Sequence, residues 1–351
     1  QSGDGDIIDC VDIYSQPSLH HPAFRNHKIQ LTPSYTNTIR SESEKTVTLT
    51  SQIWHEKGSC PEGTIPIRRT TIKNNAKEHT KFPQYNDSEM GKNNLLLTNH
   101  SMAILLTTGL AYMGGKGDIK VWNPKVESDE EYTTSRVALK SGPRNDFEAV
   151  ESGWMVNPRA YGDRQTRLYV YWTADGSRKT GCFDLMCPGF IQTTNEIALG
   201  AAIYPISTPR GLPYQITIYI RRDPYSGNWW MQYGERINVG YWPPDLFQAL
   251  MRHAETVQWG GEVFSARVGG FRTRPHTATE MGSGQFPDWI LGTSGSVERM
   301  RILGNDLALR VPDWVSAYSD EYYCYGVFYV EDYVEEPEFF YGGPGRNFQC
   351  P

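Results

Sequence analysis

Two short segments, each with one glutamate and a glycine close by, carry the residues best suited to chemistry. AVESGWMVNP at 149–158 contains Glu151, and TVQWGGEVF at 256–264 contains Glu262. Successive side chains of a strand point to opposite faces, so Trp154 and Trp259 face away from the two glutamates. The tryptophan face is typical of a core, which leaves each carboxylate on the other face. The two glutamates are far apart in sequence and meet only if their strands are neighbours on one sheet.

Two neighbouring carboxyl groups can hydrolyse a bond without a nucleophilic side chain when one is ionised and the other is protonated. Repulsion between their like charges raises the pKa of the second ionisation, so the pair titrates as a unit and activity is expected in acid. Our hypothesis gives Glu262 the role of base and Glu151 that of acid. Two alternatives stay open at this point, because glycosidases also use paired carboxylates and a strand glutamate can simply face solvent.

Other catalytic devices find little support in the sequence. Six of the eight histidines lie in the first hundred residues, whereas Ser-His-Asp and Cys-His devices need a histidine held beside the nucleophile. GxSxG and HExxH are absent, and GGKGD at 114–118 lacks the phosphate-loop pattern, so we expect a turn there. No second CxxC or histidine pair has the spacing of zinc ligands. The sequence therefore predicts no metal and no cofactor.

The bulk properties exclude two classes of partner. The 351-residue chain has a formal net charge of −6 and no basic block, which argues against binding to nucleic acid or anionic membrane. It also contains no apolar run of about 18 residues, the length that a membrane-spanning helix needs.

Six cysteines form an even set, which is typical of disulfides in a secreted protein. Six cysteines allow about 15 pairings, and proximity in sequence alone favours Cys10–Cys60, Cys182–Cys187 and Cys324–Cys350. Two sequons, at Asn86 and Asn99, also suit a secreted glycoprotein.

Many short aromatic and β-branched runs, separated by Gly, Pro, Asn and Asp, predict an all-β chain. We expect a large antiparallel two-sheet β-sandwich, jelly-roll or concanavalin-like, over residues 97–351, with a small N-terminal domain over 1–73. YQITIYIRRD and NWWMQYG predict a hairpin across Pro224–Gly227, and Pro243-Pro244-Asp245 followed by LFQALMRHAE predicts one helix. Residues 74–96 are charged and Asn-rich, which indicates an exposed linker.

Two groups of segments resemble one known family, in order along almost the whole chain. GDIIDCVDIYSQPSLHHPAFRNHKIQ and WHEKGSCPEGTIPIRRTT form the first group. The second group consists of ESGWMVNP, YWTADGSRKTGCFDLMCPGFIQ, NWWMQYG, VGYWP, VQWGGEV, EMGSGQFP and FFYGGPGRNFQCP. The first group resembles the activation peptide of the plant neprosin family of glutamic endopeptidases, and the second resembles its peptidase domain.

The resemblance implies a zymogen that cleaves after proline in acid, with the catalytic pair at Glu151 and Glu262 and the N-terminal domain as inhibitor. Its substrates would be proline-containing peptides or proteins. The linker is less basic than the family pattern, and Pro83, its one proline, is a candidate for self-cleavage. For the developing oxyanion we suggest Gln258, Tyr169 or Tyr171. An aromatic pocket for the proline ring could draw on Trp229, Trp230, Tyr241 and Trp242.

Two other functions remain open from the residues alone. A glycan- or cell-wall-binding sandwich would present exposed coplanar aromatic rings and no acidic pair. A structural secreted protein would show neither feature.

Overall fold

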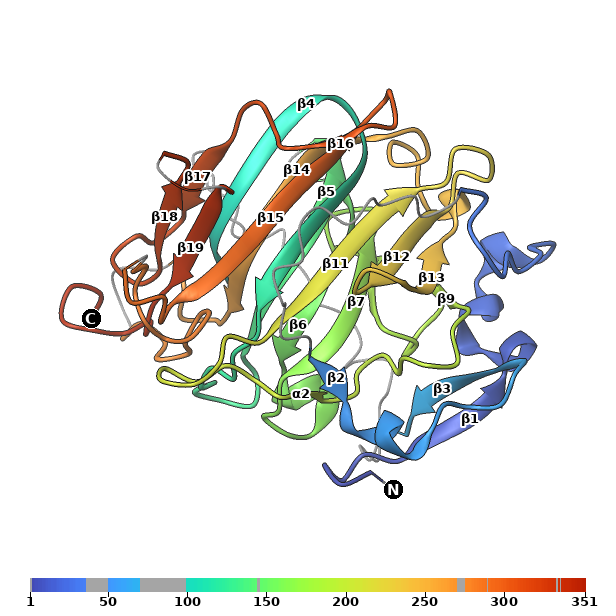
Figure 1. Ribbon diagram of the computed structural model, residues 1–351, viewed down its shortest axis with the longest axis horizontal. Helices are drawn as coiled ribbons and strands as arrows, with labels where there is room; N and C mark the ends of the chain where they lie inside the picture. Colours follow the sequence, from blue (N-terminus) through green and yellow to red (C-terminus); the bar gives the residue numbers. More distant parts are fainter. Residues whose placement is uncertain are drawn as a thin grey trace.

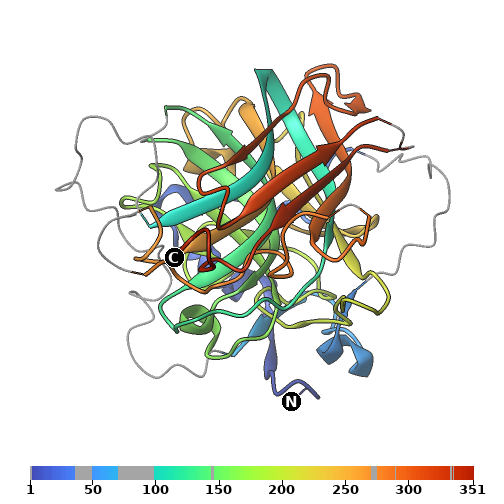
Figure 2. The same ribbon diagram turned by 90° about the vertical axis from the view of Figure 1, so that its left-hand side faces the viewer.

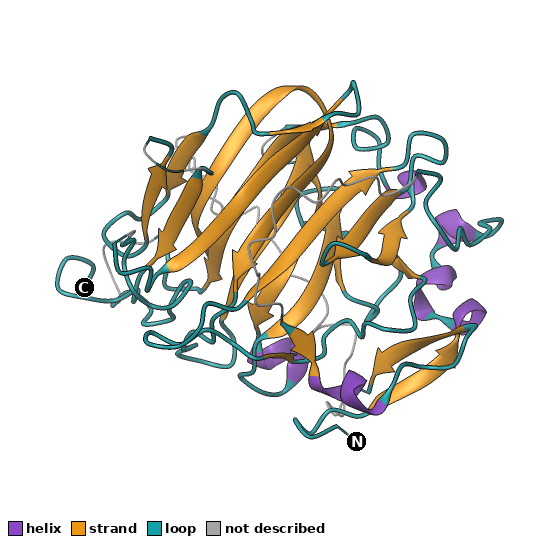
Figure 3. Cartoon of the chain, in the orientation of Figure 1, coloured by secondary structure: helices purple, strands orange, loops and turns teal. Residues whose placement is uncertain are grey.

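The computed structural model describes residues 2–35, 50–69, 99–143, 146–269, 275–288, 290–332, 334 and 336–351. Within these residues the protein is all-β, and one antiparallel sheet holds fifteen strands (Figures 1 and 3). The order along its main path is β8-β7-β6-β5-β14-β4-β11-β12-β13-β9. The strands are β4 (His100–Lys120), β5 (Tyr132–Ser141), β6 (Glu148–Val156), β7 (Arg167–Thr173), β8 (Cys182–Phe183), β9 (Ile191–Gln192), β11 (Gln215–Arg222), β12 (Trp229–Tyr233), β13 (Ile237–Trp242), β14 (Ala254–Phe264), β15 (Gly295–Gly304), β16 (Leu309–Arg310), β17 (Ser316–Ser319), β18 (Gly326–Val330) and β19 (Glu338–Gly342).

The expectation of two separate sheets is corrected by β4, which makes the two layers one curled sheet (Figure 2). The first half of this 21-residue strand pairs with β14 and β17, and its second half pairs with β11 and β15. A strand that long spans both layers, because each half supplies hydrogen bonds to a different set of neighbours.

The expected turn at 114–118 is wrong, because these residues lie inside β4. A Cβ at Gly115 would lie 2.6 Å from Val257, and one at Gly117 would lie 2.9 Å from Trp259. The Trp259 indole also donates to the Lys116 carbonyl over 2.9 Å. The glycines are therefore needed where the second half of β4 packs over β14, and they mark a close approach rather than a chain reversal.

The expected helix after Pro243 is also wrong. Pro244–Leu246 form one 3-10 turn, η6, and the chain then wraps around the buried carboxylate of Glu148. That carboxylate accepts from the backbone N–H groups of Gln248, Ala249 and Leu250 at 2.7, 2.8 and 2.7 Å. These charge-assisted bonds replace the helical pattern that the Leu periodicity indicated.

The predicted hairpin of β11 and β12 is present, and the tryptophan faces form the core between the layers. Trp154 and Trp259 are both fully buried. The one α-helix among the described residues is the single turn α2 (Pro158–Tyr161). No helix of the described chain is long and apolar enough to cross a membrane.

The N-terminal segment, defined here as residues 2–35 and 50–69, packs at one end of the sheet (blue in Figure 1). It contains β1 (Ile8–Asp12), β2 (Ser51–Gln52) and β3 (Thr64–Arg68), with 3-10 turns η1 (Ile13–Ser15), η2 (Pro17–His20), η3 (Pro22–Phe24) and η4 (Ile53–Lys57). β1 pairs with β3, and β2 pairs with β10 (Ile203–Tyr204) of the second part of the chain. The three disulfides present are Cys10–Cys60, Cys182–Cys187 and Cys324–Cys350.

Candidate active site

The two strands that carry the glutamates were expected to be neighbours, but β5 lies between them. The strand order still brings both glutamates to one face of the sheet, on either side of β5. Arg136 of β5 lies directly between Gly260 of β14 and Gly153 of β6. Glu262 is two residues from Gly260 and lies opposite Thr134 of β5. Glu151 is two residues from Gly153 and lies opposite Ala138, so the two glutamates flank Arg136 along β5. Because a step of two residues keeps the same face, both glutamates point to the side of Arg136.

One guanidinium joins the two carboxylates. Nε of Arg136 lies 2.8 Å from Oε2 of Glu151, and its Nη2 lies 2.7 Å from Oε2 of Glu262. All three side chains are buried, with exposed fractions of 1% for Arg136, 8% for Glu151 and 9% for Glu262. The carboxylates therefore share one cation in a region largely shielded from water.

Each glutamate has a further partner of its own. The Tyr169 hydroxyl donates to Oε1 of Glu151 over 2.9 Å. His100, the first residue of β4, has its Nδ1 2.7 Å from Oε1 of Glu262, and the Tyr132 hydroxyl donates to the same oxygen over 3.4 Å. The environment of Glu262 is thus richer in positive charge than that of Glu151.

These surroundings move the two pKa values apart. Burial raises the pKa of Glu262, but the charges of Arg136 and His100 outweigh it, and the pKa lies well below its ordinary value. Burial raises the pKa of Glu151 more than the charge of Arg136 lowers it, and the charge of Glu262 adds to the rise. Of the two, Glu262 therefore ionises more readily, and Glu151 keeps its proton to higher pH.

A second cation lies on the same face of β5. Lys140 is four residues from Arg136, and burial, with repulsion from Arg136, lowers the pKa of its ammonium group to about 8. Lys140 remains charged in acid and adds to the positive field at both glutamates.

The other predicted binding residues divide into two groups. Gln258 lies on the glutamate face, opposite Ala138 of β5, and Tyr171 lies opposite Glu151 with its hydroxyl 2.7 Å from the Ser177 hydroxyl. The predicted aromatic pocket is not brought to the glutamates. Its four members are buried in the main core, on β12 and β13, and are Trp229, Trp230, Tyr241 and Trp242.

Tyr241 is instead in contact with the N-terminal segment. Its hydroxyl accepts from the Gln30 backbone N–H over 3.0 Å and lies 2.8 Å from Nε2 of His27. The Asp223 carboxylate binds the same segment, accepting from the Ser34 backbone N–H over 2.7 Å. The N-terminal segment therefore contacts one of the residues that were predicted to receive the proline ring.

Two predicted sites, Pro83 and Asn86, lie outside the described residues. Asn99 is described and has a positive φ of 70°, a conformation that asparagine adopts more readily than most residues. Its carbonyl accepts from the Ser265 backbone N–H over 2.9 Å.

Sequence reasoning missed three residues of this site: Arg136, His100 and Tyr132. The alternation of TTSRVALK, residues 133–140, could have placed Arg136 and Lys140 on one strand face, as it placed the glutamates. By its position in the sequence, His100 belongs to the group of histidines in the first hundred residues. Its role depends on the register of β4 and β14, which sequence pattern does not give.

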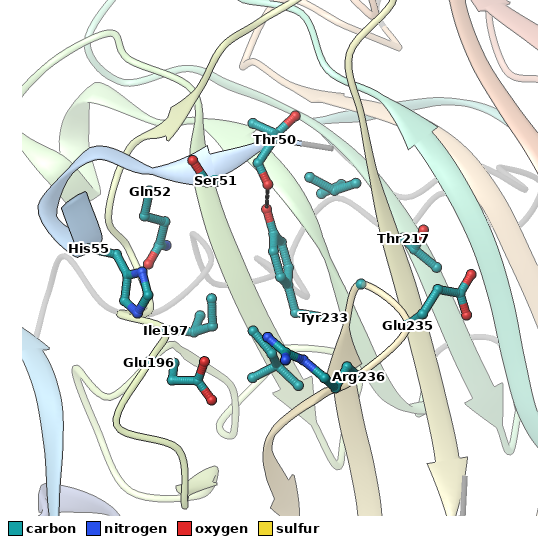
Figure 4. A pocket seen from close by; sticks show the side chains of 13 residues that line it. Thr50, Ser51, Gln52, His55, Glu196, Ile197, Thr217, Tyr233, Glu235 and Arg236 are labelled. Carbon is teal, nitrogen blue, oxygen red and sulfur yellow. Dashed lines mark hydrogen bonds between the residues drawn. The ribbon is translucent and has the colours of Figure 1, made fainter. Parts of the chain in front are cut away.

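A cavity of about 260 Å³ lies elsewhere, at the seam between the N-terminal segment and the sheet (Figure 4). His55 and Gln52 of the segment face Glu196, Tyr233 and Arg236 of the sheet across it. The Tyr233 hydroxyl donates to the Thr50 carbonyl over 2.7 Å and ties the two sides together. The cavity shares no residue with the glutamate site.

Comparison with known proteins identifies two matched regions. The model of the neprosin activation peptide matches residues 1–104, and the neprosin model matches residues 129–344. The solved structures that resemble the chain include two crystal structures of scytalido-glutamic peptidase. The complex with a peptide-based transition-state analogue has 11% identity, covers 70% of this chain and 98% of its own, and gives a TM-score of 0.35. The complex with a transition-state analogue inhibitor has the same identity and coverage and a TM-score of 0.36.

Proposed function

The chain belongs to the neprosin family and carries a neprosin activation peptide, and from that premise we propose that it is the zymogen of a secreted, acid-active glutamic endopeptidase. Its substrates are proline-containing peptides and proteins, which it cleaves on the C-terminal side of proline. The observation that carries the proposal is the buried pair of Glu151 and Glu262, joined through Arg136 and held at different pKa values.

In this proposal Glu262 is the general base. Its carboxylate takes a proton from a water molecule, which then attacks the carbonyl carbon of the scissile bond. Glu151 enters the reaction protonated and donates to the leaving nitrogen as the carbon–nitrogen bond breaks. Activity falls when the pH rises far enough to ionise Glu151, because the pair then lacks its proton donor.

The N-terminal domain, residues 1–73, acts as the inhibitor in this scheme, residues 74–96 as the activation linker, and residues 97–351 as the peptidase. Two sets of contacts support the inhibitory role. Asp6 is bound by the buried Arg167 at 2.8 Å, and the Tyr241 hydroxyl is occupied by His27 and Gln30.

The test is incubation of the full chain in acid with a peptide that contains a single proline. The expected result is one cut after that proline, located by mass spectrometry, with one ¹⁸O in the new carboxyl terminus when the reaction is run in H₂¹⁸O. The variants Glu151→Gln and Glu262→Gln serve as controls that should leave the peptide intact. The proposal would be refuted if the parent cut only at other positions, or if both variants cleaved the peptide as fast as the parent.

A further inference from the structure

Arg136 lies at the centre of the glutamate site but has no role in the scheme above. Its side chain is 1% exposed, and only two of its three nitrogens face the carboxylates, Nε toward Glu151 and Nη2 toward Glu262. Nε and the third nitrogen, Nη1, are buried and make no hydrogen bond within the described residues, and Nη1, unlike Nε, does not face a carboxylate either. A buried guanidinium group normally satisfies its N–H donors, since an unmade bond there is costly.

The neighbouring strands leave the positions beside Arg136 free of side chains. A Cβ at Gly153 would lie 2.8 Å from the Arg136 Cα, and a Cβ at Gly260 would collide with the Ala103 carbonyl on β4. Glycine is therefore required on both sides of the arginine in its row. This close approach of the backbone explains why a glycine lies two residues from each glutamate.

Two tyrosine hydroxyls on this face are already engaged. The Tyr169 hydroxyl donates to Glu151, and the Tyr171 hydroxyl pairs with Ser177. The buried amide oxygen of Gln258 has no partner, but it is an acceptor and cannot stabilise negative charge on another oxygen. The buried donors on this face without a hydrogen-bond partner include the Thr134 hydroxyl and Nη1 of Arg136. Of these two, Nη1 belongs to the group that carries a positive charge between the carboxylates.

We propose that Arg136 is a catalytic residue, whose Nη1 N–H groups bind the scissile carbonyl oxygen and stabilise the oxyanion of the tetrahedral intermediate. The inference rests on the proposed peptidase function and deepens it. When water attacks, its oxygen bonds to the carbonyl carbon, its proton passes to Glu262, and the carbonyl π electrons move to the oxygen beside Arg136. When the intermediate collapses, the electrons return, the carbon–nitrogen bond breaks, and Glu151 protonates the leaving nitrogen.

A purely electrostatic role for Arg136 makes different predictions. A lysine at this position restores the charge between the glutamates but not the planar, three-nitrogen donor set. If charge alone matters, Arg136→Lys keeps kcat and at most displaces the pH profile. If Nη1 binds the oxyanion, Arg136→Lys lowers kcat at every pH and leaves KM nearly unchanged, because the lost interaction is made only in the transition state.

The experiment compares the acid-processed full chain with Arg136→Lys, Arg136→Ala and a control, Arg299→Lys. Arg299 also pairs with a buried carboxylate, Asp118, but away from the glutamates. We expect Arg136→Lys to lower kcat by about 100- to 1,000-fold, the range for removal of one oxyanion donor, while the control stays within about threefold. Added guanidinium at millimolar concentration should restore part of the activity of Arg136→Ala in a saturable manner.

The outcomes separate this inference from the proposed function. If the parent protein cleaves no proline peptide, the proposed function fails, and the role of Arg136 fails with it. If the parent is active and Arg136→Lys keeps its kcat within about threefold, only the role of Arg136 is overturned. If Arg136→Lys unfolds at the same temperature as the parent, its kcat decides the question, even if Arg136→Ala does not fold.

Discussion

One buried ion pair contributes to the attachment of the N-terminal segment, and removing its charge should loosen the segment. The Asp6 carboxylate is 3% exposed and lies 2.8 Å from Nη1 of Arg167 and 2.7 Å from Nε of Arg68. It also accepts from the Ala202 backbone N–H over 3.2 Å. Asp6→Asn keeps the shape and one acceptor oxygen but leaves two arginines without this negative charge.

The expected magnitude follows from the burial of the pair. Breaking a buried pair by removing one partner costs about 3–5 kcal/mol. Arg167 keeps its contact with Asp163 in the variant, so the lower end, about 3 kcal/mol, is the better estimate. A loss of that size raises the population of the undocked segment by on the order of a hundredfold.

Limited proteolysis of the full chain at neutral pH measures this population, with trypsin cutting at Arg25 or Lys28 of the segment. When docking and undocking are fast relative to cleavage, the rate follows the undocked fraction, so Asp6→Asn should be cut on the order of a hundredfold faster. Asp9→Asn is the matched control in the same segment, because its pair with Arg69 is exposed and should matter little. Cleavage of Asp6→Asn within about threefold of the parent rate would refute the reasoning.

Three further predictions concern the pair, the sheet and the response to acid. Tyr169→Phe removes a hydrogen bond that favours ionised Glu151, so the alkaline limb of kcat/KM should move up by as much as about one pH unit; an unmoved limb would contradict this. Gly117→Ala puts a Cβ 2.9 Å from Trp259 and should cost about 1–3 kcal/mol in urea unfolding, whereas a neutral result would argue against the close approach. Burial lowers the pKa of His27 below 6.5, so docking of its segment is fully stable above that pH and weakens below it. Hydrogen exchange at pH 7 and pH 5 should show this change in the parent and a smaller one in His27→Gln, and equal changes in both would contradict it.

Alternation along strands is the part of the sequence that predicted the site. It placed Glu151 and Glu262 opposite Trp154 and Trp259, and the structure has both tryptophans in the core and both glutamates on the other face. The period of two is a local property of extended backbone, so a short segment is sufficient to reveal it.

Features that depend on tertiary contacts were not predicted. The glycines of β4 read locally as a turn, but Trp259 packs against them from another strand. The Leu periodicity after Pro243 read as a helix, but the buried carboxylate of Glu148 binds the backbone N–H groups of that segment. In both cases a contact with a residue distant in sequence determines the conformation, because it outweighs the local propensity.

The bridging role of Arg136 escaped sequence reasoning for a related reason. A strand arginine is common on a solvated face, and only the register of β5 between β6 and β14 places it between two carboxylates. The same register separates the pKa values of the two glutamates.

The central claim is that Glu151 and Glu262 act together on one water molecule, and kcat/KM for a single-proline peptide tests it most directly. The measurement compares the parent, Glu151→Gln, Glu262→Gln and the double variant, each after removal of the N-terminal segment and with matched thermal unfolding. We predict that either single variant loses at least about a thousandfold and that the double variant loses little more, because the two groups work as a unit. Single variants that keep activity within about tenfold, or losses that multiply in the double variant, would contradict the account.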